Sequence, residues 1–440
     1  MRVSRRRWSL TTVAATLAGV LALTTACGGD DGESGDQPSA AAGPITLTID
    51  TFGEFGYEDL LKQYEATHPN IKVNQRKVAQ LDQYSPRVQQ WIATGSGAGD
   101  VIALEEGILP TYMQQRDKFV NLFDHGGASL QNNFLPWKWN MGLSPDGKQL
   151  VGLGTDIGPL AFAYRKDLFK KAGLPTERDE VSKLWPTWDA LLETGKKFQT
   201  EVPDTKFLDG PTAILRVLVL QEAGKGPGYS YFDKSDNLVF DSNPAVKSAF
   251  DTVARFQQEG LTANMRIFTP EWQTALKRDT FATVPAPAWM LGGIEEFSGD
   301  FGKGKWDIAA VPGGAGYWGG SWLAVPKQSK HPKEAAELAK FLTGPQGQLA
   351  AYKSKNTFPS SPQAQQDPAV AQSKSEYFSN APIGQIFTAA ASQVKPVYLG
   401  PKNESVREDV EDILLGMGQG KVKAADAWSQ AVEAAEKAAR

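Results

Sequence analysis

Two adjacent carboxylates, Glu105 and Glu106, are the residues of this chain best suited to acid–base chemistry. Hydrolysis of a glycosidic bond needs two carboxylates on opposite sides of the scissile bond, roughly 5 to 9 Å apart. Adjacent residues at one strand end seldom meet that requirement, although another carboxylate elsewhere in the chain could supply the partner. We therefore favour a binding site without catalysis and keep a glycoside hydrolase as an alternative.

Metal chemistry finds no support in the sequence. The three histidines, His68, His125 and His331, are far apart, and the only cysteine is Cys27 near the N-terminus. No cluster has the spacing of a zinc site, and neither a G-x-S-x-G nucleophile elbow nor a phosphate-binding P-loop occurs. We expect no metal and no cofactor.

A G-x-G-x-x-G string occurs at Gly314, Gly316 and Gly319. In dinucleotide-binding folds such a string leads into a helix whose N-terminus faces the pyrophosphate. Here it leads into the strand-like run 322–325, so the pattern indicates a glycine-rich bend between lobes.

Tryptophan is the compositional oddity, with 12 residues against three histidines and six methionines. Flat indole rings stack well on the apolar C–H faces of pyranose sugars, so some of these side chains are candidates for sugar binding. Trp137 and Trp139 alternate, which means that one can face a cleft while the other packs. Trp185 and Trp188 stand at a helix entrance, and we assign them to structure.

The elements that must position these residues alternate between strands and helices. Apolar residues alternate with polar ones over 45–50, a helical spacing follows over 57–64, and a second strand begins at 71. Strand–helix–strand is the unit of a parallel α/β sheet. Ligands of open α/β sheets lie beyond the carboxyl ends of the strands, which selects loops 52–56, 104–107 and 155–158. Further helices are expected at 84–94, 188–198, 213–221, 244–258, 332–342 and from 404 to the C-terminus, and further strands at 100–104, 160–164, 306–311 and 322–325.

The N-terminus has the layout of an export signal. Four arginines precede an apolar stretch over 13–23 that is too short to span a bilayer, so residues 1–26 are predicted to be a signal peptide. Cys27 then stands where a lipoprotein cysteine would be acylated, although Thr24 replaces the leucine usual three positions earlier. Residues 27–43 are expected to form the lipidated N-terminus and a flexible tether. Whether the general secretory or the twin-arginine route is used stays open.

The net charge limits the possible partners, and the chain length limits the possible architectures. The formal net charge of −4 becomes −8 when the four signal arginines are removed, which disfavours nucleic acid as a partner. About 400 mature residues exceed what one hydrophobic core normally organises, so two lobes are expected.

Several short motifs follow one another in a characteristic order and spacing between residue 45 and the C-terminus. The first set is GDVI at 99–102, YRKDLF at 164–169, GLP at 173–175, PTWD at 186–189, APAWM at 286–290, VPG at 311–313 and GGSWLAV at 319–325; the second set is TDIG at 155–158, SKLWPTW at 182–188 and TFPSS at 357–361. By the first set the sequence resembles the extracellular carbohydrate-binding proteins of ABC importers, the maltose-binding-protein-like family. By the second set it is most similar, within that family, to actinobacterial cellobiose- and cello-oligosaccharide-binding lipoproteins.

The resemblance implies a two-lobed α/β periplasmic-binding-protein-like fold with a multi-strand hinge and discontinuous lobes. It places lobe 1 at 44–155 plus 313–358 and lobe 2 at 156–312 plus 359–440. It implies a monomer, lipid-anchored on the extracellular face of the cytoplasmic membrane, that captures an oligosaccharide, with cellobiose or cello-oligosaccharides as the first choice, and delivers it to an ABC transporter permease. A binder of another disaccharide, a polyol or glycerol phosphate stays an alternative.

The resemblance also implies which side chains contact the ligand. Tryptophans would stack on the sugar rings and loop carboxylates would accept hydrogen bonds from the hydroxyls. The candidate ligand-binding residues are Trp289, Trp322, Trp318, Ser321, Asp156, Glu54, Phe55, Glu105, Glu106 and Phe358, and the lipidation site is Cys27.

Overall fold

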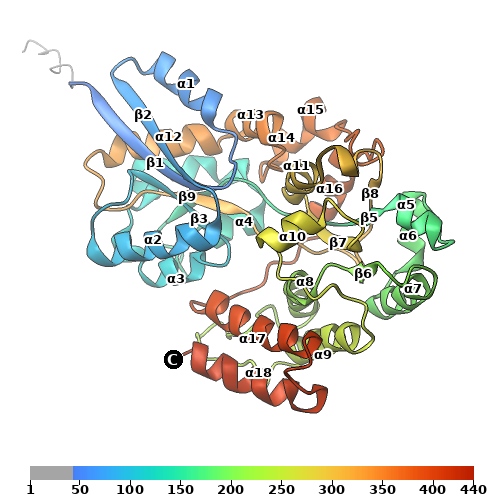
Figure 1. The fold of residues 1–440 in the computed structure, drawn as a ribbon. Coiled ribbons are helices and arrows are strands. Elements are labelled where there is room, and N and C mark those ends of the chain that lie inside the picture. Colours follow the sequence, from blue (N-terminus) through green and yellow to red (C-terminus); the bar gives the residue numbers. More distant parts are fainter. Residues whose placement is uncertain (1–42) are drawn as a thin grey trace, which may run out of the picture. The chain divides into compact units, whose positions relative to one another are not determined.

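The computed structural model describes residues 43–440, which form two β-sheets, each with its own helices (Figure 1). The signal, Cys27 and nearly all of the tether lie outside the described residues. Within 43–440, no helix is both long and apolar enough to cross a bilayer.

The first sheet has the strand order β2-β1-β3-β9-β4. Strand β1 pairs in parallel with β2 and β3, as the strand–helix–strand pattern predicts, whereas β9 runs antiparallel to β3 and β4. The sheet is therefore mixed, because β9 returns from the second sheet in the opposite direction. Its strands are β1 (Ile45–Phe52), β2 (Ile71–Val78), β3 (Val101–Glu105), β4 (Gly152–Gly154) and β9 (Ser321–Ala324).

Helices cover both faces of this sheet. Buried side chains of α1 and α12 share one hydrophobic cluster with Val101 and Ala103 of β3, whereas those of α2 and α3 share another with Ile102 and Leu104. This alternation follows from the two-residue side-chain period of a strand. The helices of this half are α1 (Glu58–Thr67), α2 (Leu81–Thr94), α3 (Leu109–Gln114), α4 (Pro136–Met141), α12 (Pro332–Thr343) and α13 (Pro345–Lys355), with 3-10 turns η1 (Arg116–Lys118), η2 (Leu122–His125) and η3 (Gly127–Asn133).

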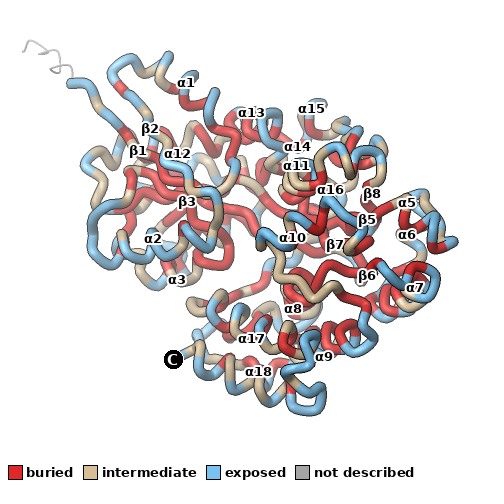
Figure 2. The backbone as a smooth tube through the Cα atoms, viewed as in Figure 1, coloured by how far each residue is buried: buried red, intermediate tan, exposed pale blue. Residues whose placement is uncertain are grey.

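The second sheet has the order β6-β7-β5-β8, with β5 antiparallel to β7 and β8. The strands of this sheet are buried, as the red tube in Figure 2 shows. Together with the helices of this half they form one large hydrophobic core, distinct from the two clusters of the first sheet. The strands are β5 (Leu160–Arg165), β6 (Lys206–Leu208), β7 (Phe281–Pro287) and β8 (Trp306–Ala309); the helices are α5 (Lys166–Lys171), α6 (Arg178–Leu184), α7 (Trp188–Glu201), α8 (Pro211–Lys225), α9 (Pro244–Gln258), α10 (Pro270–Ala275), α11 (Met290–Gly302), α14 (Pro362–Gln366), α15 (Pro368–Ala371), α16 (Ile383–Ser392), α17 (Asn403–Gly418) and α18 (Ala424–Ala438).

Three segments connect the two halves: 155–159 after β4, 310–320 between β8 and β9, and 356–361 after α13. They also bond to one another, since the amide of Ile157 donates to the carbonyl of Phe358 at 2.9 Å and that of Trp318 donates to Gly158 at 2.8 Å. The glycine string predicted to be a bend lies in the second segment.

Most predicted elements are present, with bounds shifted by a few residues. Three strands are not anticipated, and neither are several helices, among them α10, α11, α13 and α16. Strands β4 and β6 have three residues each, and β7 contains Pro285 and Pro287, so none shows a clear alternating pattern. The expected C-terminal helical region is two helices, α17 and α18, separated by a turn in which Gly420 has φ of 70°.

A substitution at Trp185 tests the packing of the hydrophobic core around the second sheet. Its side chain is buried, and the indole N–H donates to the carbonyl of Ala310 at 2.8 Å. Replacing Trp185 with Ala should lower the free energy of unfolding by about 3–5 kcal/mol, because the cavity cannot collapse fully. Urea denaturation measures this change, with the exposed Lys183→Ala on α6 as the control. A loss no larger than that of the control would contradict the packing described.

Candidate ligand-binding site

Two of the three loops selected by the strand-end rule meet at the start of β9. The amide of Glu106 donates to the carbonyl of Gly320 at 3.0 Å, and Glu106 Oε2 accepts from the amide of Gly319 at 2.9 Å. From the other loop, Asp156 Oδ1 accepts from the amide of Ser321 at 3.2 Å. Loops 104–107 and 155–158 are therefore joined through the residues that precede and begin β9.

Glu105 and Glu106 are both buried at this junction. Burial raises the pKa of Glu105 to about 7, with Arg216 opposing the rise and Glu404 adding to it. Burial also raises the pKa of Glu106, although the Tyr317 hydroxyl and the positive charge of Arg216 both act to lower it. Two carboxylates are thus held where water is excluded and their charged forms are poorly solvated.

Lys138 is a buried cation at the same junction, and it is absent from the predicted set. Its side chain is 0% exposed, and burial lowers its pKa to about 7 although Asp156, Glu106 and Glu105 pull it upward. Its position between Trp137 and Trp139 marks the segment as aromatic, but nothing in the sequence distinguishes a buried lysine from a surface one.

The junction contains buried polar atoms that have no hydrogen-bond partner. They are Glu106 Oε1, Lys138 Nζ and the indole nitrogen of Trp137. Leaving a buried polar group unpaired costs about 1–3 kcal/mol, so native structures rarely keep several together. Such a group of donors and acceptors is typical of a site that a polar ligand completes.

Aromatic rings from the second half and from the second connecting segment form one wall beside these groups. The rings of Trp289 and Trp318 meet edge to face at 5.6 Å, and the Trp289 indole donates to the carbonyl of Trp318 at 2.9 Å. Phe268 contributes a third ring, 5.9 Å from Trp289 and 6.1 Å from Trp318. Its backbone has φ of 68°, which is rare for a bulky residue. Trp289 is half-buried, whereas Trp318 is buried.

Trp322 lies on β9 and packs within the first half. It belongs to the hydrophobic cluster of α2 and α3, and its indole donates to the carbonyl of Lys138 at 3.1 Å. The ammonium of Lys138 lies 3.3 Å from the centre of the Trp322 rings. The structure therefore places Trp322 next to the junction but with one ring face already covered.

Trp137 and Trp139 have different neighbours. Trp139 is buried and stacks on Phe134 in the first half. Trp137 packs against Tyr317 of the second connecting segment, with ring centres 5.5 Å apart. Trp137 is therefore the member of the pair that lies at the junction.

A charged network borders the junction. Arg216 Nη2 contacts Glu404 at 2.9 Å, and Arg407 Nη2 contacts the same carboxylate at 2.7 Å. Burial opposes the charge on Glu404, but the two arginines outweigh it and lower its pKa to about 2. Arg216 also lies 5.2 Å from the Trp318 ring centre, so the network abuts the aromatic wall.

Three predicted site residues lie apart from this junction. Glu54 is exposed and pairs with Lys77 at 2.7 Å and Lys355 at 3.4 Å. Phe358 is buried in the second core, where it meets Tyr352 and Phe387 edge to face. The third, Phe55, belongs to a small cavity nearby.

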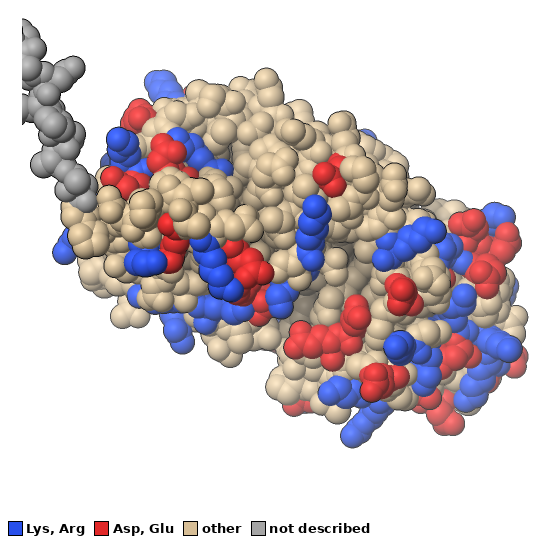
Figure 3. Space-filling view, turned by 90° about the horizontal axis from the view of Figure 1, so that it is seen from above, with Lys and Arg blue, Asp and Glu red and all other residues tan. Residues whose placement is uncertain are grey.

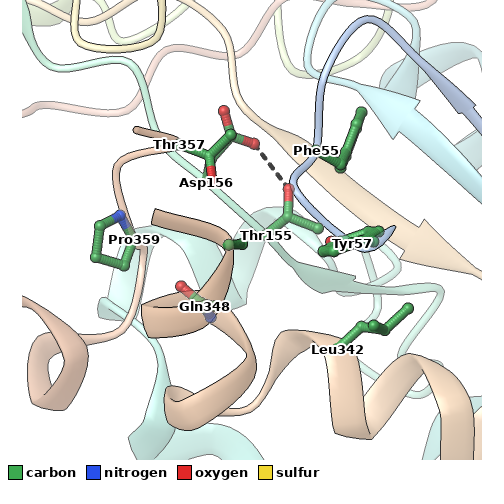
Figure 4. A pocket seen from close by; sticks show the side chains of 9 residues that line it. Phe55, Tyr57, Thr155, Asp156, Leu342, Gln348, Thr357 and Pro359 are labelled. Carbon is green, nitrogen blue, oxygen red and sulfur yellow. Dashed lines mark hydrogen bonds between the residues drawn. The ribbon is translucent and has the colours of Figure 1, made fainter. Parts of the chain in front are cut away.

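That cavity lies beside Asp156, between the first connecting segment and α13 (Figure 4). Phe55, Thr155 and Gln348 are among its lining residues, and the Thr155 hydroxyl donates to Asp156 Oδ1 at 2.8 Å. Its volume of about 10 Å³ has room for about one water molecule, so a sugar ring does not fit there.

The described residues give little support to a metal ion or a nucleic acid as the ligand. No group of three or more histidine, cysteine or acidic side chains in residues 43–440 could hold a metal ion. Basic and acidic side chains are interspersed on the face shown in Figure 3, without a broad basic surface there. Such a mixture does not match the charge of a nucleic-acid backbone.

One family model and several known proteins are similar to this chain. The family model described as bacterial extracellular solute-binding protein matches residues 59–378. The chain is similar to the arabinooligosaccharide-binding protein of Bacillus subtilis (strain 168), at 25% identity over 71% of this chain and 72% of that protein. It is also similar to the lactose-binding protein of Rhizobium radiobacter, at 26% identity over 62% of each chain.

Solved structures confirm the predicted two-lobed fold. A crystal structure of an extracellular solute-binding protein of family 1 superposes with a TM-score of 0.82 and 39% identity, over 90% of this chain and 100% of that one. The galacto-N-biose-/lacto-N-biose I-binding protein of Bifidobacterium longum, in complex with lacto-N-biose, shares the fold, with a TM-score of 0.74 and 20% identity over 91% and 98% of the two chains.

The charged network predicts an acid-dependent loss of stability. Because the pKa of Glu404 is lowered below its unfolded value, its ion pairs contribute fully above about pH 4.5 and are lost as pH falls toward 2. Their contribution is on the order of 3 kcal/mol. Urea unfolding from pH 6 to 3 should therefore show a smaller decline for Glu404→Gln than for the unchanged protein. Glu433→Gln, exposed on α18, should follow the unchanged protein, and equal declines for all three would contradict the network.

Proposed function

The chain belongs to the bacterial extracellular solute-binding proteins, and we propose that it captures an oligosaccharide and delivers it to the permease of an ABC importer. The arabinooligosaccharide- and lactose-binding relatives support a sugar of at least two rings as the solute. Binding proteins of this kind need no chemistry, so the site has only to recognise, enclose and release its ligand.

One observation carries this proposal: unpaired buried polar atoms lie beside tryptophan rings at the junction of the two halves. Glu106 Oε1 is an acceptor without a donor, while Lys138 Nζ and the Trp137 indole are donors without an acceptor. Sugar hydroxyls both donate and accept, so a single ligand can satisfy all three groups. Trp289 and Trp318 offer the flat surfaces that suit the C–H faces of the rings.

We propose that the three connecting segments act as a hinge between lobe 1 (44–155 plus 313–358) and lobe 2 (156–312 plus 359–440). Ligand would enter when the lobes separate and would shift the population toward the closed form by its greater affinity for that form. The permease would recognise the closed form.

Cellobiose and cello-oligosaccharides remain our first choice of ligand, on the strength of the motifs at 155–158, 182–188 and 357–361. A different disaccharide or a polyol is the alternative. The acidic residues of the junction argue against a phosphorylated solute, because it would face the carboxylates of Glu105, Glu106 and Asp156.

Attachment to the membrane through Cys27 is part of the same proposal. A signal over residues 1–26 would direct export, and acyl chains on Cys27 would hold the protein at the extracellular face of the cytoplasmic membrane. A monomer suffices for this role, since both lobes come from one chain.

A ligand screen tests the function directly. Residues 43–440 should gain thermal stability with at least one sugar from a panel of disaccharides and oligosaccharides, because a ligand that binds only the folded state raises its stability. Calorimetry then gives the affinity. Stabilisation by a peptide or an amino acid, with no response to any carbohydrate, would refute the proposal.

The hydrolase alternative makes a different prediction. Glu105 Oε2 accepts from the amide of Gly107 at 2.6 Å and Glu106 Oε2 from that of Gly319, so one oxygen of each carboxylate is already engaged. We expect cello-oligosaccharides incubated with the protein to be recovered intact by chromatography. Release of shorter sugars would replace the binding role with catalysis.

Trp289 should contribute directly to affinity. Replacing it with Ala should weaken binding of the sugar found in the screen by at least about 1 kcal/mol, the scale of a lost aromatic contact. Trp428→Ala is the matched control, because that indole lies on α18 and stacks on Phe240. Unchanged affinity in the Trp289 variant, measured by calorimetry, would remove this residue from the site.

A further inference from the structure

Lys138 has an environment that structural packing alone does not explain. Its side chain is fully buried, and its ammonium has three N–H donors but no hydrogen-bond acceptor in the described chain. A buried charge normally pairs or coordinates, because desolvation of an ammonium is costly. The residue therefore has donors to offer at a place from which water is excluded.

The surrounding chain is shaped to hold this side chain. A Cβ added to Gly154 would lie 2.8 Å from Lys138 Cγ, and one added to Gly320 would lie 2.9 Å from Nζ. Trp322 also holds this side chain in place. Its indole N–H donates to the Lys138 carbonyl, and the Lys138 ammonium lies over its ring, 3.3 Å from the ring centre. The attraction between a cation and an indole face positions the ammonium and leaves its N–H groups without a hydrogen-bond acceptor.

The acceptor that would complement these donors also lies beside Gly320, because the amide of Glu106 donates to the Gly320 carbonyl at 3.0 Å. Glu106 receives the Gly319 amide on Oε2, which leaves Oε1 without a partner. Asp156 has one oxygen engaged, since its Oδ1 accepts from the Thr155 hydroxyl and from the amide of Ser321. Among the fully buried side-chain atoms of the junction, Lys138 Nζ is thus a cationic donor and Glu106 Oε1 an anionic acceptor without a hydrogen-bond partner.

We infer that Lys138 determines ligand specificity in the proposed site by donating to a sugar hydroxyl, with Glu106 Oε1 accepting from the ligand and Trp322 acting as a positioning residue. This inference rests on the proposed function. It selects neutral sugars, because Glu105, Glu106 and Asp156 would repel a carboxylate or phosphate on the ligand. It also gives Trp322 a role different from stacking on the sugar, since Lys138 covers its ring.

The test pairs protein variants with ligand variants. Cellobiose, lactose and the monodeoxy analogues of whichever binds are titrated by calorimetry into the unchanged protein and into Lys138→Met, which keeps the length and loses the charge. The unchanged protein should bind at least one analogue about 10- to 100-fold more weakly, the scale of a lost hydrogen bond to a charged group. Lys138→Met should bind the parent sugar more weakly by a similar factor and should show no further loss with that analogue.

Controls separate this specificity role from a purely structural one. Lys183→Met, exposed on α6, should behave as the unchanged protein does, and Trp322→Phe should keep more affinity than Trp322→Leu because it retains an aromatic face. Unchanged affinity in Lys138→Met, or losses that add independently for protein and ligand, would overturn the inference while leaving oligosaccharide capture intact. Failure of the unchanged protein to bind either sugar would overturn it as well, and a response to no carbohydrate at all would also refute the proposed function.

Discussion

The close approach of Gly158 to the second connecting segment is the constraint on which the site depends. A Cβ at Gly158 would lie 1.8 Å from the carbonyl oxygen of Trp318, so only glycine allows these two backbones to touch. Their contact fixes where β9 begins, and β9 in turn aligns with the end of β3. The carboxylates of one half and the indoles of the other are neighbours because these backbones meet.

The junction keeps buried polar atoms without hydrogen-bond partners, and the molecule tolerates their cost because each half has its own hydrophobic core. The first sheet buries apolar side chains on both faces, and the second half has a continuous cluster that includes Trp185, Trp272 and Trp306. Cys27, the only cysteine, leaves no possibility of an internal disulfide, so these cores must supply the stability. Sites that bind polar ligands commonly sacrifice local stability for function.

The sequence predicts the long elements, and it selects two loops that the structure brings together, because both follow from local patterns. Periodicity identifies α9 and α12, and the strand-end rule selects Glu105 and Asp156 before any contact is known. The positions of Lys138 and Arg216 at the junction are not predicted, because the burial of a charged side chain depends on segments that are far away in the sequence. The same rule selects Glu54, but its pairing with Lys77 and Lys355 is likewise not readable from the local sequence.

The position of β9 has a consequence for how the chain reaches its native state. Ala103 pairs with Leu323, so the first sheet cannot be completed until most of the chain has been synthesised. Pairings between such distant residues slow folding, because a long loop must close before the contact stabilises it. Slow closure of this kind suits an export pathway that carries unfolded chains, because such a pathway needs a chain that has not yet folded.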